Sequence, residues 1–281
     1  MRVWQWTKNA LVFAPLVFGA GLLSLDLLSS TILVFFAMCF AASAAYVLND
    51  LFDINEDRKH PFKKNRPIAS GAISKHEAYV LLTLLLILAS GFAVYVSTSV
   101  MFLVTFYIIL NLLYSKVLKH MVIIDILIVA FFYIYRVYVG GIASDLHISG
   151  WLVMTTFCLS LFMITGKRRA EIASIENKPH GSRKVLSLYN QQFLDAALVM
   201  SITLFIVFYS LYSILVQDGL FIMTILPVVY ISFRYLYLAF VKNEGEEPEK
   251  LIFKDKEILM AGFILGTLII AALYLNLGWL N

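Results

Sequence analysis

Nine long apolar runs alternate with polar segments along the 281-residue chain. They lie at residues 11–28, 31–48, 77–96, 99–115, 121–142, 151–166, 192–216, 219–241 and 258–279. Each is close to the roughly 20 residues with which a helix crosses a bilayer core, although the sixth is shorter. The runs show no two-residue alternation, and lipid cannot satisfy the edges of an open sheet. The pattern therefore predicts an all-α integral membrane protein with nine transmembrane helices.

The composition agrees with this prediction. Hydrophobic residues make up 61% of the chain and charged residues only 14%, whereas about a quarter of the residues of a soluble domain are charged. This excludes a soluble globular enzyme, a disordered scaffold and a disulfide-stapled secreted domain. The two cysteines, Cys39 and Cys158, lie in apolar runs and indicate neither a disulfide framework nor a metal site.

Lysine and arginine occur in every second connection between the apolar runs. The N-terminal segment and the connections after runs two, four, six and eight are basic, whereas the alternate connections contain no Lys or Arg. Because basic loops stay in the cytoplasm, we expect a cytoplasmic N-terminus and an outside C-terminus. The expected location is the plasma (inner) membrane.

Two connections, about 49–76 and 167–191, are longer than the others and follow runs two and six. Both are expected in the cytoplasm, within a single transmembrane domain that covers residues 1–281. Their spacing of four runs hints at a duplicated four-helix unit. We therefore expect any chemistry in a cavity that faces the cytoplasm.

An acidic motif opens the first long connection. Asn49, Asp53 and Asp57 repeat at four-residue steps, which places them on one face of a helix, and Asp50 is one turn from Asp53. A divalent cation would offset the repulsion between these carboxylates, and hard oxygen ligands suit Mg²⁺. We predict Asn49, Asp53 and Asp57 as metal ligands and Asp50, Asp53 and Asp57 as catalytic residues. The alternative is a solvated acidic helix end.

A dense basic run follows this motif at once. Acids beside such a run are typical of a site that holds a metal ion and phosphoryl oxygens together. Within the run, the predicted phosphate-binding residues are Arg58, Lys63 and Arg66.

The NDxxDxxxD pattern that begins at Asn49 resembles the UbiA-type superfamily of intramembrane prenyltransferases. The strings QWTKN, DRKHPFKKNRPIASG and KRRAE resemble its decaprenyl-phosphate phosphoribosyltransferase branch, and the likeness runs from Trp4 to the PEKLIFKDKEIL segment at 248–259. The resemblance implies a UbiA-type bundle of nine helices with Mg²⁺ as cofactor. It also implies transfer of 5-phosphoribosyl from phosphoribosyl diphosphate (PRPP) to polyprenyl phosphate, for cell-envelope glycolipid precursors.

Three cations, Lys167, Arg168 and Arg169, stand where typical members of that superfamily carry a second acidic motif. Exchanging carboxylates for cations removes a metal site and creates an anion site. The resemblance therefore implies that these residues grip the additional phosphate groups of PRPP and polyprenyl phosphate. The alternative is an anchor that only fixes the topology.

Other polar residues are weaker candidates for substrate binding. The resemblance implies that Lys8 and Asn9 contribute to PRPP binding, with anchoring at the membrane interface as the alternative. Tyr46 precedes Asn49 by three residues, and core packing is its alternative role. The remaining candidates are Lys116 and Lys119, at the end of run four, and Arg136.

Charged residues within the later runs also need partners. Asp125 and Arg136 lie in run five, where a charge at membrane depth is expensive, and Arg136 suits a phosphate in a cavity. Asp195 and Arg234 are candidates for an ion pair across runs seven and eight.

Two other functions remain open. A conventional UbiA-type enzyme joins a prenyl diphosphate to an aromatic or lipid acceptor but would need the missing second acidic motif. A transporter of phosphorylated metabolites places charges near the midplane, whereas most charges here lie at one expected face. The expected partners are the two substrates and membrane lipid, with no nucleic acid. The oligomeric state is open, a homo-oligomer included.

Overall fold

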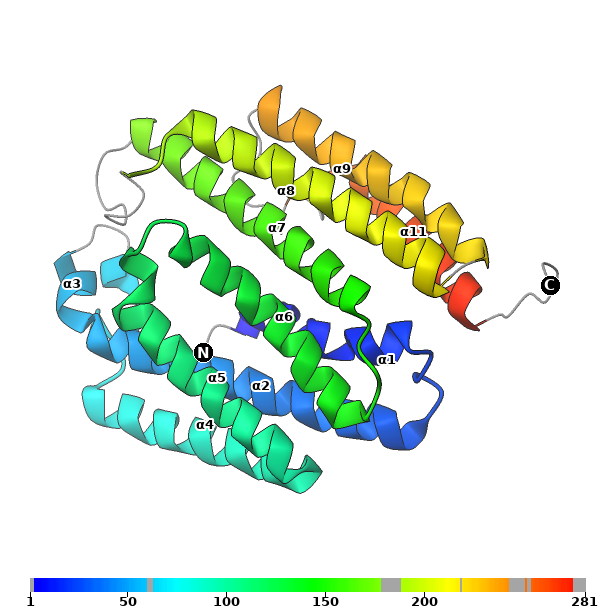
Figure 1. Ribbon diagram of the computed structural model, residues 1–281. Helices are drawn as coiled ribbons and strands as arrows, with labels where there is room; N and C mark the ends of the chain where they lie inside the picture. The colour runs from blue at the N-terminus through cyan, green and yellow to red at the C-terminus, as the bar shows by residue number, and fades with distance from the viewer. Residues whose placement is uncertain are drawn as a thin grey trace. The chain divides into compact units, whose positions relative to one another are not determined.

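The computed structural model describes residues 3–59, 63–177, 188–217, 219–242, 251 and 254–274, and every regular element within these ranges is a helix (Figure 1). The chain divides into two compact units. The first comprises Met1–Asp125 and Tyr135–His147, and the second comprises Ile126–Ile134 and Ile148–Asn281.

The first unit is built around one long helix. Its elements are η1 (Val3–Phe13), α1 (Ala14–Phe18), α2 (Leu25–Phe52), α3 (Ile54–Lys59), η2 (Lys63–Asn65), α4 (Lys75–Val96), α5 (Thr98–Lys116), η3 (Leu118–His120) and most of α6 (Ile124–Ser144). The central helix α2 packs against η1, α4 and α5. A capping box between Ser74 and Glu77 starts α4, and the Ser97 hydroxyl caps α5. These caps hold α4 and α5 as separate helices across a short turn.

The second unit is a group of antiparallel helices. Its elements are the middle of α6 (Ile126–Ile134), α7 (Gly150–Asn177), α8 (Gln191–Tyr212), η5 (Ser213–Gln217), η6 (Gly219–Thr224), α9 (Ile225–Phe240) and α11 (Lys256–Tyr274). The pairs α7 with α8 and α9 with α11 lie side by side (Figure 1). Phe162, Leu198, Leu238 and Ile258 belong to one of the buried apolar clusters of this unit.

Eight helical segments in the described part of the chain are long and apolar enough to cross a membrane. They coincide with predicted runs two to nine. Large apolar side chains lie on their outer surfaces, including Phe102, Phe233 and Phe263, which are 72%, 66% and 74% exposed. Such exposure would be costly in water but is favourable in lipid. The prediction of an all-α, multi-pass membrane protein is therefore confirmed.

The predicted extent of the first apolar run is wrong. The N-terminal helical segment covers Val3–Phe18 rather than 11–28, and α2 already begins at Leu25. Between them the chain turns at Gly19–Gly21, where Ala20 has a positive φ of 53°. Two backbone bonds close this turn, from Gly19 N to Pro15 O and from Gly21 N to Leu16 O. Hydropathy did not reveal the break because glycine and alanine do not interrupt an apolar run.

The predicted loop boundaries also need correction. Helix α2 continues to Phe52 and α7 to Asn177, so the expected connections 49–76 and 167–191 both begin inside helices. The KRRAE string is part of α7, not of a loop. Hydropathy marks where an apolar environment ends, and a helix can continue beyond that point in polar residues. In α7 the lysine, arginines and glutamate of KRRAE are themselves good helix formers. The predicted loop segment 178–187 lies outside the described residues.

Candidate functional site

The acidic motif lies at the junction of α2 and α3. Helix α2 ends at Phe52 and α3 begins at Ile54, with Asp53 between them. The backbone nevertheless keeps its four-residue steps, because Asp53 N bonds Asn49 O at 2.9 Å and Asp57 N bonds Asp53 O at 2.8 Å. The predicted spacing of 49, 53 and 57 is therefore realised across the junction.

Arg66 joins two of the carboxylates. Its Nη1 atom lies 3.1 Å from Asp50 Oδ1 and 2.6 Å from Asp57 Oδ2. The side chain of Asp57 is only 3% exposed, that of Asp50 14% and that of Arg66 24%. One guanidinium nitrogen therefore bridges two carboxylates that are largely shielded from water.

The third carboxylate has a different cation. Lys119 Nζ in η3 lies 3.4 Å from Asp53 Oδ2, and the Asp53 side chain is 25% exposed. The neighbouring Lys116, at the end of α5, places Nζ 4.4 Å from the centre of the Phe52 ring. The sequence-predicted residues Asp50, Asp53, Asp57, Arg66 and Lys119 thus form one cluster in the first unit.

Other residues of the basic run shape the adjoining loop. Arg58 Nε donates to the carbonyl oxygen of Ala69 at 3.1 Å, which closes the chain between α3 and α4. Lys63 lies in η2, and its carbonyl accepts from Arg66 N at 2.9 Å. Tyr46 is partly buried in α2, one turn before Asn49. Arg58 is therefore engaged with the backbone, while Arg66 is engaged with the acids.

The donor chemistry of this cluster fits a divalent cation. Asp50 and Asp57 already bind the positively charged guanidinium of Arg66. The Asp53 carboxylate and the Asn49 amide belong to the same motif. The described residues contain no group of three His, Cys, Asp or Glu close enough to enclose a metal ion. Mg²⁺ usually binds one or two carboxylates, substrate phosphates and waters rather than a closed protein cage. Asn49, Asp50, Asp53 and Asp57 are therefore suitable ligands for a metal that arrives with a phosphate.

A second polar network lies deeper in the same unit. Arg136 Nε donates to Asn9 Oδ1 at 2.7 Å, and its Nη2 donates to the Tyr107 hydroxyl at 2.9 Å. Asn9 Nδ2 in turn donates to Cys39 Sγ at 3.2 Å. Arg136 is 6% exposed and Asn9 is fully buried, while Lys8 is partly exposed. These bonds tie η1 to α2, α5 and the part of α6 in this unit.

Tyr107 was not among the predicted site residues. A signal for it exists in the sequence, because Tyr107 and Asn111 are polar residues one helical turn apart in an apolar run. In the structure Asn111 Nδ2 donates to the carbonyl oxygen of Tyr107 at 2.8 Å.

A close backbone approach reinforces this network. A Cβ atom added at Gly140 would lie 2.0 Å from the carbonyl oxygen of Val12. Glycine therefore permits η1 to lie directly against α6, as small residues do at helix contacts in membranes.

In the second unit, the three consecutive cations have different environments. Lys167 is exposed, whereas Arg168 is 4% exposed and its Nη1 lies 2.8 Å from Glu171 Oε2. Arg169 Nε lies 2.5 Å from Asp195 Oδ1 in α8, and its Nη1 donates to the Ala239 carbonyl of α9 at 3.1 Å. Arg169 therefore connects the three helices α7, α8 and α9.

The expected pair of Asp195 with Arg234 is not formed. Asp195 binds Arg169, and Arg234 Nη2 lies 2.9 Å from Asp255 and 3.1 Å from Glu257. The hydrogen bond from Arg234 lowers the pKa of Asp255 below its ordinary value. Partners so distant along the chain could not be read from helical spacing.

Asp125 is fully buried in the first turn of α6. Arg136 follows it by eleven residues on the same helix. Both residues were expected within run five. In the structure Asp125 lies at the N-terminal end of α6, whereas Arg136 lies in the interior of the helix.

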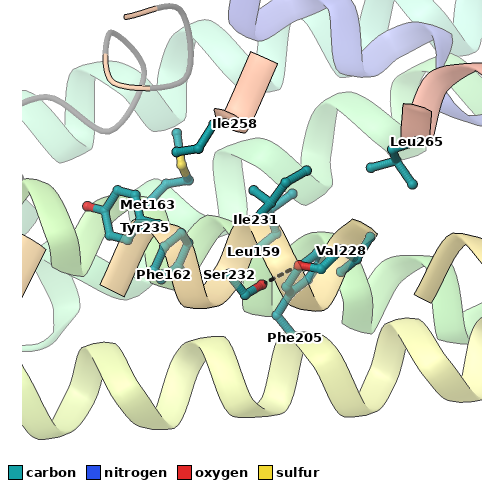
Figure 2. A pocket seen from close by; sticks show the side chains of 10 residues that line it. All are labelled: Leu159, Phe162, Met163, Phe205, Val228, Ile231, Ser232, Tyr235, Ile258 and Leu265. Atoms are coloured by element: carbon teal, nitrogen blue, oxygen red, sulfur yellow. Dashed lines mark hydrogen bonds between the residues drawn. The ribbon is translucent and has the colours of Figure 1, made fainter. Parts of the chain in front are cut away.

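An apolar cavity of about 190 Å³ lies within the second unit. Figure 2 shows its lining from α7, α8, α9 and α11, with Ser232 donating a hydrogen bond to the Val228 carbonyl. No Lys, Arg, Asp or Glu is among the side chains that line it. It suits apolar atoms and does not suit a phosphate.

The fold and the cluster together define an integral membrane protein with a carboxylate and cation site suited to a metal-bound phosphate. A model of the UbiA prenyltransferase family matches residues 10–258, and the chain belongs to that family.

Relatives within the family cover nearly the whole chain. Decaprenyl-phosphate phosphoribosyltransferase of Mycolicibacterium smegmatis is 33% identical, over 98% of this chain and 92% of that protein. The protein of the same name from Corynebacterium glutamicum is 31% identical, over 98% and 86%. A solved UbiA homolog from Archaeoglobus fulgidus, bound to GPP and Mg²⁺, has a TM-score of 0.69 and 16% identity, over 95% and 94%. That structure supports the fold of the present chain.

Proposed function

We propose that this enzyme transfers the 5-phosphoribosyl group of PRPP to a polyprenyl phosphate and releases diphosphate. The observation that carries the proposal is the near full-length similarity to decaprenyl-phosphate phosphoribosyltransferases. It is supported by the carboxylate and cation cluster at the junction of α2 and α3, which suits a metal-bound diphosphate.

The reaction exchanges one oxygen for another at C1 of the ribose. A phosphate oxygen of the lipid forms a bond to C1, and the bond from C1 to the diphosphate breaks, so that diphosphate leaves with the electron pair. Mg²⁺ bound at this site would neutralise part of the charge of the leaving diphosphate. Asn49, Asp53 and the neighbouring carboxylates would hold it there, and Lys116 and Lys119 would bind phosphate oxygens. The lipid phosphate is already anionic, so the chain need not supply a strong base.

The direct test is an incubation of purified protein with PRPP, Mg²⁺ and polyprenyl phosphate. The expected products are diphosphate and a phosphoribosylated lipid, measured by phosphate release and by mass spectrometry. A protein that instead consumes a prenyl diphosphate with an aromatic or lipid acceptor would contradict the proposal and support the conventional UbiA-type reaction.

Substitutions of Arg168 and Arg169 are predicted to have different effects, the first on donor binding and the second on stability. Arg168→Ala is expected to raise the KM for PRPP by about one to two orders of magnitude, with a much smaller effect on the KM for polyprenyl phosphate. Arg168→Lys should recover only part of this, because an ammonium cannot reproduce the guanidinium fork. Arg169→Ala should mainly lower the melting temperature, since it leaves Asp195 without its partner in α7. Parental KM values for Arg168→Ala, at equal amounts of inserted protein, would show that the string is only an anchor.

We further propose nine membrane crossings, with a cytoplasmic N-terminus, an outside C-terminus and a cavity that opens toward the cytoplasm. The segment Val3–Phe18 would supply the ninth crossing. Eleven residues of 3-10 helix and five of α-helix span about 30 Å, because a 3-10 helix rises about 2.0 Å per residue. That length matches the hydrocarbon core of a bilayer.

Cysteine labelling tests this orientation. In a variant lacking Cys39 and Cys158, a cysteine at Ser149 should react with an impermeant thiol reagent added to intact cells. A cysteine at Ser174 should react only after the cells are opened. The reverse pattern would contradict the orientation and the proposed cytoplasmic entry of PRPP.

A further inference from the structure

Arg66 occupies the place between two carboxylates where a metal ion would be expected to bind. Its Nη1 atom contacts Asp50 at 3.1 Å and Asp57 at 2.6 Å. A divalent cation bound to the same oxygens would lie within a few ångströms of the guanidinium. Two positive groups at that separation repel each other strongly in a site that is largely shielded from water. The contact of Arg66 with these two oxygens and the binding of a metal ion to the same two oxygens are therefore mutually exclusive.

We propose that Arg66 is a displaceable counter-ion that exchanges carboxylates for phosphate oxygens when a metal-bound diphosphate enters. In the substrate-free enzyme it offsets part of the negative charge of Asp50 and Asp57. On binding, its guanidinium leaves them and grips the diphosphate, for which its planar fork is well suited. The inference rests on the proposed function only in that this site takes a metal-bound diphosphate.

The geometry allows Arg66 to make this exchange without refolding of the loop. Its backbone is held by bonds that do not involve the guanidinium, from Arg66 N to Lys63 O at 2.9 Å and from Ser70 N to Arg66 O at 2.8 Å. The side chain is 24% exposed and has several rotatable bonds. Arg169 is a useful contrast, because Asp195, the Ala239 carbonyl and the Phe240 ring all hold its guanidinium.

The exchange has a consequence for the order of binding. Metal alone must compete with Arg66, whereas metal with diphosphate offers Arg66 a new anionic partner. The metal and the diphosphate should therefore bind cooperatively. If Arg66 instead had a permanent structural role, its removal would weaken the binding of metal alone, because the carboxylates would no longer be held in position. The two roles therefore predict opposite changes in the affinity for metal alone.

The test uses Mn²⁺ and inorganic diphosphate with the purified full-length protein. Bound Mn²⁺ is measured by electron paramagnetic resonance, and protein-bound diphosphate by equilibrium filtration in the presence of Mn²⁺. Arg66→Gln is expected to bind Mn²⁺ alone about tenfold more tightly than the parent, because the competing charge is gone. The same variant should bind Mn²⁺-diphosphate about tenfold more weakly. Lys75→Gln, at the exposed first residue of α4, removes the same charge and should change neither affinity.

Arg66→Lys provides a second measurement that keeps the charge if Arg66→Gln folds poorly. It should bind Mn²⁺ alone like the parent and Mn²⁺-diphosphate several-fold more weakly. Unchanged or weaker binding of Mn²⁺ alone by Arg66→Gln would overturn the proposal, as would parental diphosphate affinity in Arg66→Lys. Neither measurement uses PRPP or lipid, so failure of phosphoribosyl transfer would contradict the proposed reaction without affecting this result.

Discussion

Replacing Asp53 with alanine is expected to lower the rate of phosphoribosyl transfer by at least about 10²-fold, with little change in the amount of folded protein. Asp53 is the most exposed of the three carboxylates in the acidic motif. Its side chain is 25% exposed, and its contact with Lys119 is 3.4 Å long. Loss of this carboxylate removes a ligand while leaving the helices around it in place. The measurement is diphosphate release at saturating PRPP and polyprenyl phosphate.

Two further variants separate this effect from a general loss of charge. Asp26→Asn removes a carboxylate from the other end of the same helix, where Asp26 is exposed, and should retain parental activity. Asp57→Asn should lose both activity and thermal stability, because Asp57 is 3% exposed and binds Arg66. Full turnover by Asp53→Ala in the presence of EDTA would rule out the metal assignment.

Gly140→Ala is expected to lower the stability of the protein by about 3 kcal/mol or more. The added Cβ atom would lie 2.0 Å from the Val12 carbonyl oxygen and 2.8 Å from the Val12 carbonyl carbon. Because both are backbone atoms, no side-chain rotation can relieve the overlap. The N-terminal segment would have to move away from α6, and the Arg136–Asn9 bond would lengthen with it. The melting temperature in detergent and the yield of monodisperse protein measure this effect.

Other glycines provide the matched controls. A Cβ atom at Gly91 in α4 or at Gly266 in α11 would meet no heavy atom within 4 Å. At these sites alanine should be neutral or stabilising by up to about 1 kcal/mol, because glycine is a weak helix former. Equal melting temperatures for Gly140→Ala and Gly91→Ala would contradict the close approach of η1 to α6.

Much of the fold follows from local patterns. Eight of the nine predicted runs coincide with helices of membrane-crossing length, because a helix in lipid must satisfy its backbone internally. The predicted extent of the first run was wrong because the break at Gly19–Gly21 contains no polar residue. The ends of α2 and α7 were placed too early because their last turns are polar but still helical.

The candidate site was predictable in its residues but not in its pairings. The four-residue spacing of the acidic motif was enough to predict that Asn49, Asp53 and Asp57 lie on one face of a helix. The contact of Arg66 with both Asp50 and Asp57 depends on how the loop folds back between α3 and α4. That fold is stabilised by the bond from Arg58 to Ala69, eleven residues apart, which no periodicity reveals.

The sequence by itself determined the membrane class, the helical repeat of the acidic motif and the family resemblance. These follow from residue type and spacing, since burial in lipid and helix geometry act on each segment separately. Only the tertiary structure decided that Arg169 pairs with Asp195 and that Arg136 donates hydrogen bonds to Asn9 and Tyr107. It also decided that the backbone of Val12 packs directly against Gly140. A buried charge takes its partner from whichever helix packs against it, and the chain order does not specify that neighbour.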